Sequence, residues 1–273
     1  MLTVLKLGGE LLEDAGAMAT AAASVARLAS AGPIAVVHGG GRAIDADLRA
    51  RGVSPRFADG LRITDADTLA TVVGVLAGRI NTAFVAALNA AGVRAVGLTG
   101  ADAGVAAAHV APPFRSANGT HVDLGLVGAL DTASSPALLR DLIAFGYVPV
   151  VASVGATGEG TLLNVNADTL ASHLAAGLGA QRLIIAGSTP GVLAPDGATY
   201  ALLTESDARA LTTAGTATDG MIAKLRACVS ALERGVAEIR IVSGRSGDYA
   251  TAAGTNLVAE RATIHGLTNS LIH

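Results

Sequence analysis

The sequence predicts an α/β fold, a three-layer α/β/α sandwich around a mostly parallel central sheet, with two lobes. Short apolar runs rich in Val, Ile and Leu recur along the chain between longer Ala-rich segments. Strands that are apolar throughout must be covered on both faces, which is typical of parallel sheets between two helical layers. With 51% hydrophobic and 15% charged residues, the chain can bury enough apolar surface to fold, which excludes a disordered protein.

The elements alternate along the chain. The apolar runs predict strands at 2–7, 34–37, 95–98, 148–152, 183–186 and 239–242. Helical periodicity predicts helices over 14–30, 43–51, 66–91, 136–145, 167–178, 206–211 and 221–234. Segment 109–130 departs from this alternation, because Pro112, Pro113 and the Asn118-Gly119 pair favour turns, and we expect a β-hairpin there. We expect the two lobes, residues 1–180 and 181–273, to share one continuous sheet.

Composition excludes several classes of function. The formal net charge is −3 without a block of like charge, and aromatic residues make up 3%, so we expect no nucleic-acid or membrane partner. No apolar stretch reaches the roughly 18 to 20 uninterrupted residues of a membrane span. Cys228 is the single cysteine, which excludes an intrachain disulfide and favours a cytoplasmic protein. The six histidines lack metal-site spacing, so no dedicated metal site is expected.

Lysine is scarce in this chain. Of its 19 basic residues only Lys6 and Lys224 are lysines. In a chain so biased toward Arg, a position that keeps Lys is expected to need a compact ammonium group, as a tight phosphate pocket does. Lys6 precedes Gly8 and Gly9, and Lys224 lies one turn into a predicted helix. The alternative is that both are solvated surface lysines retained by chance.

A second glycine-rich loop, 38–41 (HGGG), joins a predicted strand to a predicted helix. Consecutive glycines let the main chain approach an anion, and the helix start turns unpaired N–H groups toward it. The loop therefore indicates phosphate or substrate binding, although tight turns use glycine too. Motifs of P-loop, dinucleotide-binding, serine-hydrolase and protein-kinase folds are absent.

Seven motifs follow the order and spacing found in the amino acid kinase family, and the chain resembles its N-acetylglutamate kinase branch over nearly its whole length. They are KLGG (6–9), VHGGG (37–41), GLRIT (60–64), VGLTG (96–100), DLGLVG (123–128), NVNAD (164–168) and DGMIAK (219–224). The resemblance implies transfer of the ATP γ-phosphoryl group to the side-chain carboxylate of N-acetyl-L-glutamate, which yields N-acetyl-L-glutamyl 5-phosphate and ADP in arginine biosynthesis. A carboxylate is already ionised at pH 7, so no general base is needed.

The resemblance also assigns roles. Lys6 and Lys224 would stabilise the transferring phosphoryl group, and Asp168 would orient both ammonium groups. Arg62 would pair with the α-carboxylate of the acceptor, and Asn164 would hydrogen-bond to the acceptor. N–H groups for phosphate and acceptor would come from Gly8, Gly9, Gly40 and Gly41. The nucleotide, as ATP with Mg²⁺ held mainly by its phosphates, would contact Ser188, Thr189, Pro190, Gly191, Val192, Leu193, Thr216, Ala217 and Thr218.

The residues alone leave simpler interpretations open. Arg62 is equally well explained as a surface cation. Asp168 is explained as an acid that a helix dipole favours, and Asn166 is explained as a helix N-cap. In the nucleotide region Ser188-Thr189 stands where related kinases have an Asp followed by an aliphatic residue, so the ATP contacts are expected to differ there.

By resemblance, the N-terminal lobe would bind the acceptor and dimerise, and the C-terminal lobe would bind ATP. Only five residues precede Lys6, where arginine-inhibited members carry an extra helix, so a homodimer without arginine feedback is expected. The apolar pattern of segment 66–91 is compatible with a helix that contributes to a dimer interface or with a helix that is buried in the core. Two other functions remain open, an aminoadipate-type kinase that also forms an acyl phosphate and a catalytically silent sensor. The joint presence of Lys6, Asp168 and Lys224 favours an enzyme over a sensor.

Overall fold

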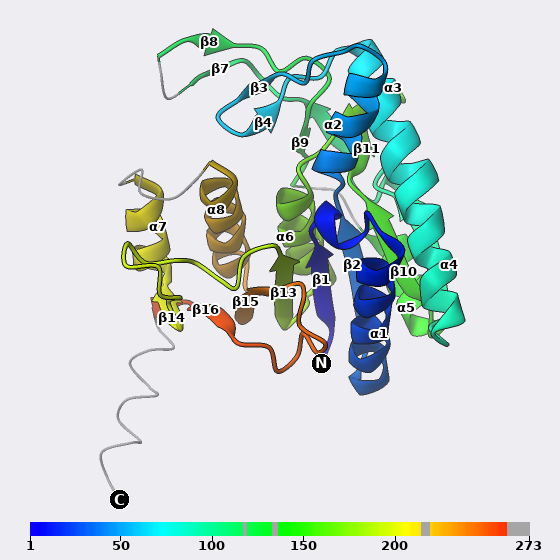
Figure 1. Ribbon diagram of the computed structural model, residues 1–273, viewed down its shortest axis with the longest axis vertical. Coiled ribbons are helices and arrows are strands. Elements are labelled where there is room, and N and C mark those ends of the chain that lie inside the picture. The colour runs from blue at the N-terminus through cyan, green and yellow to red at the C-terminus, as the bar shows by residue number, and fades with distance from the viewer. Residues whose placement is uncertain (117–118, 133–135, 214–218, 261–273) are drawn as a thin grey trace, which may run out of the picture.

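The computed structural model describes residues 1–116, 119–132, 136–213 and 219–260 (Figure 1). Its centre is an eight-stranded sheet. In spatial order the strands are β14 (Leu202–Thr204), β16 (Gly254–Val258), β15 (Glu238–Ser243), β13 (Arg182–Gly187), β1 (Thr3–Leu7), β2 (Ile34–His38), β10 (Val148–Ala152) and β5 (Ala95–Thr99). The six strands from β15 to β5 are parallel, whereas β16 runs antiparallel to β15 and parallel to β14. The prediction of a mostly parallel sheet is confirmed.

Helices cover both faces of the sheet, as predicted. On one face lie α1 (Ala15–Ala31), α2 (Gly41–Ala50), α3 (Ala66–Val73), the π-helix η2 (Gly74–Asn81) and α4 (Thr82–Ala90). On the other face lie α5 (Ala137–Ala144), α6 (Ala167–Leu178), α7 (Glu205–Thr213) and α8 (Asp219–Glu233). Successive strand residues face opposite layers. Leu5 and Leu7 therefore pack with the first layer and Val4 with the second, and Lys6 points the same way as Val4.

The sheet register brings three strand ends to one level. In β1, Leu7 is paired with Ala186 of β13 on one side and with His38 of β2 on the other. The loops that follow these parallel strands consequently start side by side at the carboxyl edge of the sheet. Strands that precede residue 180 form one half of the sheet and strands that follow it form the other half, with the border between β1 and β13.

Four small antiparallel pairs accompany the main sheet. They are β3 (Phe57–Ala58) with β4 (Leu61–Arg62), β6 (Ala108–Val110) with β9 (Gly128–Leu130), β7 (Phe114–Arg115) with β8 (His121–Val122), and β11 (Val154–Ala156) with β12 (Leu162–Asn164). The β-hairpin expected over 109–130 is confirmed as the nested pairs β6–β9 and β7–β8, although Asn118 of its turn lies outside the described residues. The hairpins β3–β4 and β7–β8 project beyond the carboxyl edge of the sheet, at the top of Figure 1.

The segment Ala66–Ala90 forms one continuous helix of 25 residues that is long and apolar enough, by length and composition, to cross a membrane, although charged and polar residues interrupt it. Its apolar residues have another explanation, because Phe84 and Leu88 are fully buried in the core, where the helix contacts α1 and β5. Two short 3₁₀ helices, η1 (Gly9–Leu11) and η3 (Asp102–Gly104), complete the described elements.

Phe84 provides a test of this burial. We expect Phe84→Ala to lower the free energy of unfolding by about 3 to 5 kcal/mol, because it removes a fully buried ring and leaves a cavity. Phe145, which is 73% exposed, is the matched control. We expect Phe145→Ala to change the free energy of unfolding by less than about 0.5 kcal/mol. Urea denaturation measures both values, and equal losses in the two variants would contradict the assignment of this helix to the core.

Candidate active site

The two lysines of the chain meet at one carboxylate. Lys6 Nζ, from β1, lies 3.0 Å from Asp168 Oδ1. Lys224 Nζ, from α8, donates to both oxygens of Asp168, at 3.2 and 3.3 Å. All three side chains are about nine-tenths buried, with exposed fractions of 10% to 12%. The interpretation of the lysines as solvated surface residues is therefore wrong.

Burial and neighbouring charges shift the pKa values of Asp168 and Lys224. Burial by itself would raise the pKa of Asp168, but the two ammonium groups outweigh it and lower that pKa from 3.8 to about 2. Burial, together with the charge of Lys6, lowers the pKa of Lys224, and Asp168 opposes this shift. One carboxylate faces two cations, so the cluster has a net positive charge that suits an anion such as a phosphoryl group.

Two glycine loops touch beside this cluster. A Cβ on Gly9 would overlap the backbone of Gly40, so only glycine permits this approach of the loop after β1 to the loop after β2. Among the described residues, the backbone N–H groups of Gly9, Gly40 and Gly41 have no protein acceptor. The N–H of Gly8 instead donates to the carbonyl of Ala186 at 2.8 Å, so Gly8 does not supply the free donor that the sequence suggested.

Arg62 is a buried residue at the mouth of the same cavity. Its guanidinium group lies 2.6 Å from Asp45 Oδ1, donates from Nη2 to the carbonyl of Gly41 at 3.2 Å, and stacks on Phe57 at 4.7 Å. Only 7% of its side chain is exposed, so its interpretation as a surface cation is wrong. Three contacts hold the planar guanidinium in place, as recognition of a carboxylate by two hydrogen bonds requires.

The start of α6 places the remaining polar groups. Asn166 caps this helix, since its side chain accepts from the backbone N–H groups of Asp168 and Thr169, as its alternative interpretation predicted. This cap fixes the first turn, which carries Asp168. Asn164, two residues earlier, donates from Nδ2 to Thr64 Oγ1 at 3.1 Å and lines the cavity.

A cavity of about 270 Å³ lies beside these groups, and Lys224 is not among the residues that line it. Of the predicted site residues it is lined by Lys6, Gly8, Gly9, Gly40, Gly41, Arg62, Asn164 and Asp168. Sequence reasoning missed Glu10, Ile44, Phe57, Leu61, Leu76, Val127 and Ser153, which also line it. Glu10 directly follows the KLGG motif, so its position beside that motif was a signal that could have identified it. Leu61 and Val127 lie within the GLRIT and DLGLVG motifs, whereas Ile44, Phe57 and Leu76 belong to none of the seven motifs.

The predicted nucleotide residues 188–193 are not among the residues that line this cavity. The segment 188–193 starts at the carboxyl end of β13, next to β1, and Ser188, Pro190 and Leu193 are exposed. Val192 belongs to the core, and its N–H donates to Thr255 Oγ1 at 2.8 Å. Thr216, Ala217 and Thr218 lie outside the described residues.

Comparison with known proteins connects this geometry to a family. Residues 1–243 match the model of the amino acid kinase family. The chain belongs to this family. The resemblance noted from the sequence is confirmed.

Individual relatives are similar over most of the chain. An acetylglutamate kinase of Solibacter usitatus (strain Ellin6076) is 42% identical over 245 residues, which are 89% of this chain and 91% of the relative. Among solved structures, smu.665 from Streptococcus mutans UA159 has a TM-score of 0.79 at 25% identity. The matched region is 94% of this chain and 98% of the smu.665 chain. N-acetylglutamate synthase from Neisseria gonorrhoeae, complexed with coenzyme A and N-acetyl-glutamate, has a TM-score of 0.80 at 25% identity. It covers 95% of this chain, which spans only 59% of that protein.

The charge cluster predicts a pH-dependent stability. Asp168→Asn leaves two buried ammonium groups without their carboxylate, and we expect it to lower the free energy of unfolding by about 3 to 5 kcal/mol near neutral pH. Since folding lowers the pKa of Asp168 to about 2, its stabilising effect is complete above the unfolded pKa of 3.8 and disappears as pH falls through the folded value.

Urea denaturation at a series of pH values measures this effect. The difference between wild type and Asp168→Asn should be constant above about pH 5 and shrink below about pH 4. Glu159→Gln, at an exposed turn, is the control and should follow the wild type throughout. A difference that persists unchanged in acid would contradict the assignment of the charge to Asp168.

Proposed function

We propose that this chain is an acetylglutamate kinase, which transfers the ATP γ-phosphoryl group to the side-chain carboxylate of N-acetyl-L-glutamate. The observation that carries the proposal is the convergence of Lys6 and Lys224 on Asp168 beside two glycine loops, in a chain about 40% identical to acetylglutamate kinases. The reaction joins two anions, so the site must chiefly neutralise charge and hold the reactants in line. The two ammonium groups supply the neutralisation, and the unpaired N–H groups supply fixed donors.

The acceptor is proposed to lie between Arg62 and Asn164. The guanidinium of Arg62 would pair with the α-carboxylate, and Asn164 would bind the polar groups of the acetylated amine. The apolar side chains of Leu61, Leu76 and Val127 in the same cavity can contact the methyl group of the acetyl moiety. The side-chain carboxylate would then point toward Lys6.

ATP is proposed to lie on the other side of the phosphoryl position, over the half of the sheet formed after residue 180. This arrangement divides the chain into an acceptor-binding lobe, 1–180, and a nucleotide-binding lobe, 181–273. The segment 188–193 starts at the carboxyl end of β13, where ligands of open α/β sheets generally bind, and this supports its assignment to the nucleotide.

Mg²⁺ is proposed to accompany ATP and to be held mainly by the phosphates. The carboxylate of Glu10 fits such an ion, since it lines the cavity so close to Gly8 that a Cβ there would overlap it. No cation faces Glu10 among the described residues, and a carboxylate oxygen is a hard donor of the kind Mg²⁺ prefers. When bound, the positive ion would reduce the repulsion between the carboxylate of Glu10 and the negatively charged phosphates.

We also propose a cytoplasmic homodimer. The helix Ala66–Ala90 supports this assembly, since it lies next to the edge strand β5, and the small residues Ala70, Gly74 and Gly78 are exposed along it.

Acceptor profiling tests the proposed function. With ATP and Mg²⁺, we expect ADP release in the presence of N-acetyl-L-glutamate and far slower release with glutamate, aspartate or aminoadipate. Preference for aminoadipate would assign the chain to the related acyl-phosphate-forming kinase. No release with any acceptor, despite nucleotide binding, would indicate a silent sensor.

Arg62→Ala tests the acceptor end of the site. We expect the KM for acetylglutamate to rise at least 10-fold, because loss of a charge-assisted pair costs about 1.5 to 3 kcal/mol, while the KM for ATP changes little. Arg56→Ala is the control, since the exposed Arg56 pairs only with Asp65 among the described residues. Equal rises in both KM values for Arg62→Ala would refute the assignment.

A further inference from the structure

His38 is the first residue of the second glycine-rich loop, 38–41, and is fully buried. It is the last residue of β2, on the face that α1 to α4 cover. Its Nδ1 is 3.2 Å from the carbonyl oxygen of Gly39, and its Nε2 is 3.0 Å from Asn81 Nδ2. The imidazole thus bridges the glycine loop and the π-helix η2.

The partners of Asn81 determine where the imidazole proton lies. Asn81 Nδ2 is 3.0 Å from the carbonyl oxygen of Val150, which can only accept, so the group at this position is the NH₂. Its second hydrogen points to His38 Nε2, which must therefore accept. The single proton of the neutral imidazole is then on Nδ1, and His38 donates it to the carbonyl of Gly39.

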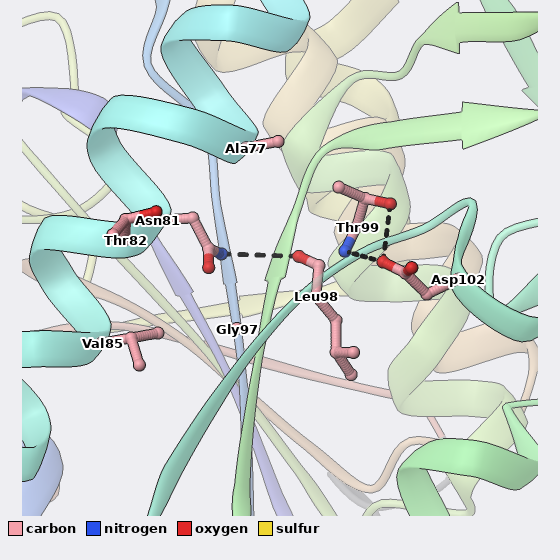
Figure 2. Close-up of a pocket in the computed structure, with 8 residues that line it drawn as sticks. All are labelled: Ala77, Asn81, Thr82, Val85, Gly97, Leu98, Thr99 and Asp102. Carbon is pink, nitrogen blue, oxygen red and sulfur yellow. Dashed lines mark hydrogen bonds between the residues drawn. The ribbon is translucent and has the colours of Figure 1, made fainter.

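The position of Asn81 is itself determined by its surroundings. Figure 2 shows its side chain reaching from the helix to β5, where Nδ2 also lies 3.4 Å from the carbonyl oxygen of Leu98. Its Oδ1 packs against Gly97, where any Cβ would overlap it. Asn81 is the last residue of η2, and a π-helical turn commonly marks a functional position because it shifts the side chains that follow.

Burial keeps the imidazole neutral. It lowers the pKa of His38 to about 4, while the hydrogen bond to Gly39 acts in the opposite direction. A protonated imidazole would present a second N–H to the NH₂ of Asn81 and lose that bond. At neutral pH His38 consequently acts as a fixed donor to Gly39.

The direction of the Gly39 carbonyl fixes that of the next N–H. The Gly39–Gly40 peptide is trans, and in a trans peptide the C=O and the N–H point in opposite directions. While His38 holds the carbonyl on the buried side, the N–H of Gly40 points away from the imidazole, and Gly40 itself lines the cavity. This N–H has no protein acceptor among the described residues.

We propose that His38 and Asn81 are positioning residues, which lock the Gly39–Gly40 peptide so that the Gly40 N–H is ready to bind the transferring phosphoryl group. Glycine gives this loop its close approach to Gly9 but also the freedom to rotate the peptide. The imidazole removes that freedom before substrate binds, which is the preorganisation that transition-state stabilisation requires. The kinetic consequence rests on the proposed function, whereas the tautomer does not.

Nitrogen-15 NMR of the histidine imidazoles tests the tautomer in the unmodified protein. We expect Nδ1 of His38 to be protonated and Nε2 to be unprotonated, with its signals assigned by their loss in His38→Asn. A protonated Nε2 would overturn the inference. This measurement needs no substrate, so its outcome is independent of which acceptor the enzyme uses.

Two variants of His38 test the consequence for catalysis. The amide of His38→Gln can reach the Nε2 position and accept from Asn81 but gives Gly39 no donor, whereas that of His38→Asn can reach the Nδ1 position and donate to Gly39. We expect kcat to fall about 10- to 100-fold in the Gln variant with little change in either KM, and to stay within about 3-fold of wild type in the Asn variant.

Wild-type kcat in a folded Gln variant would overturn the proposal, as would equal losses of kcat in the two variants. If the Gln variant does not fold, the other two measurements test the proposal. A protonated Nε2, or a kcat of the Asn variant that falls well below one third of the wild-type value, would then overturn it. An inactive wild type toward every acceptor would refute the proposed function and leave the tautomer result standing.

Discussion

The pairing of two ammonium groups with one buried carboxylate is the constraint on which the rest of the site depends. Lys6 comes from the middle of the sheet, Asp168 from the start of α6 and Lys224 from α8. Isolated charges at this depth would cost several kcal/mol each, so the three groups stabilise only when they are assembled together. The fold must therefore bring β1, α6 and α8 together to within hydrogen-bond distance, and two of the three groups, Lys6 and Asp168, also line the cavity.

Close backbone contact is the second constraint on the site. Gly9 and Gly40 approach each other because neither carries a side chain, and the register of β1 with β2 brings their loops to the same level. Within the described part of the chain, the N–H groups of Gly9, Gly40 and Gly41 have no protein acceptor, whereas in an ordinary turn such groups would bind water. Around them, Arg62 and the imidazole of His38 are held by contacts of their own, so the polar groups of the cavity are oriented before any ligand arrives.

Most of the architecture could be predicted from the sequence because apolar runs and helical periodicity are local signals. Strand β10 and helix α6 have the predicted bounds, and the scarcity of lysine was sufficient to single out Lys6 and Lys224. The π-helical turn, the reversed β16 and the pairing of Arg62 with Asp45 could not be predicted, since each depends on contacts between distant segments. Gly8 shows the limit of motif reasoning, because its N–H is already bonded to Ala186 in the sheet.

The burial of both lysines at Asp168 also affects what happens after turnover. An acyl phosphate is an activated carboxylic acid that reacts with free amines to form amides, and lysine side chains are its commonest targets on a protein surface. This chain has no lysine besides the two that are buried around Asp168, and its other strongly basic side chains are arginines, whose guanidinium groups stay protonated and are poor nucleophiles. The enzyme therefore releases a reactive electrophile across a surface that has no lysine for it to modify.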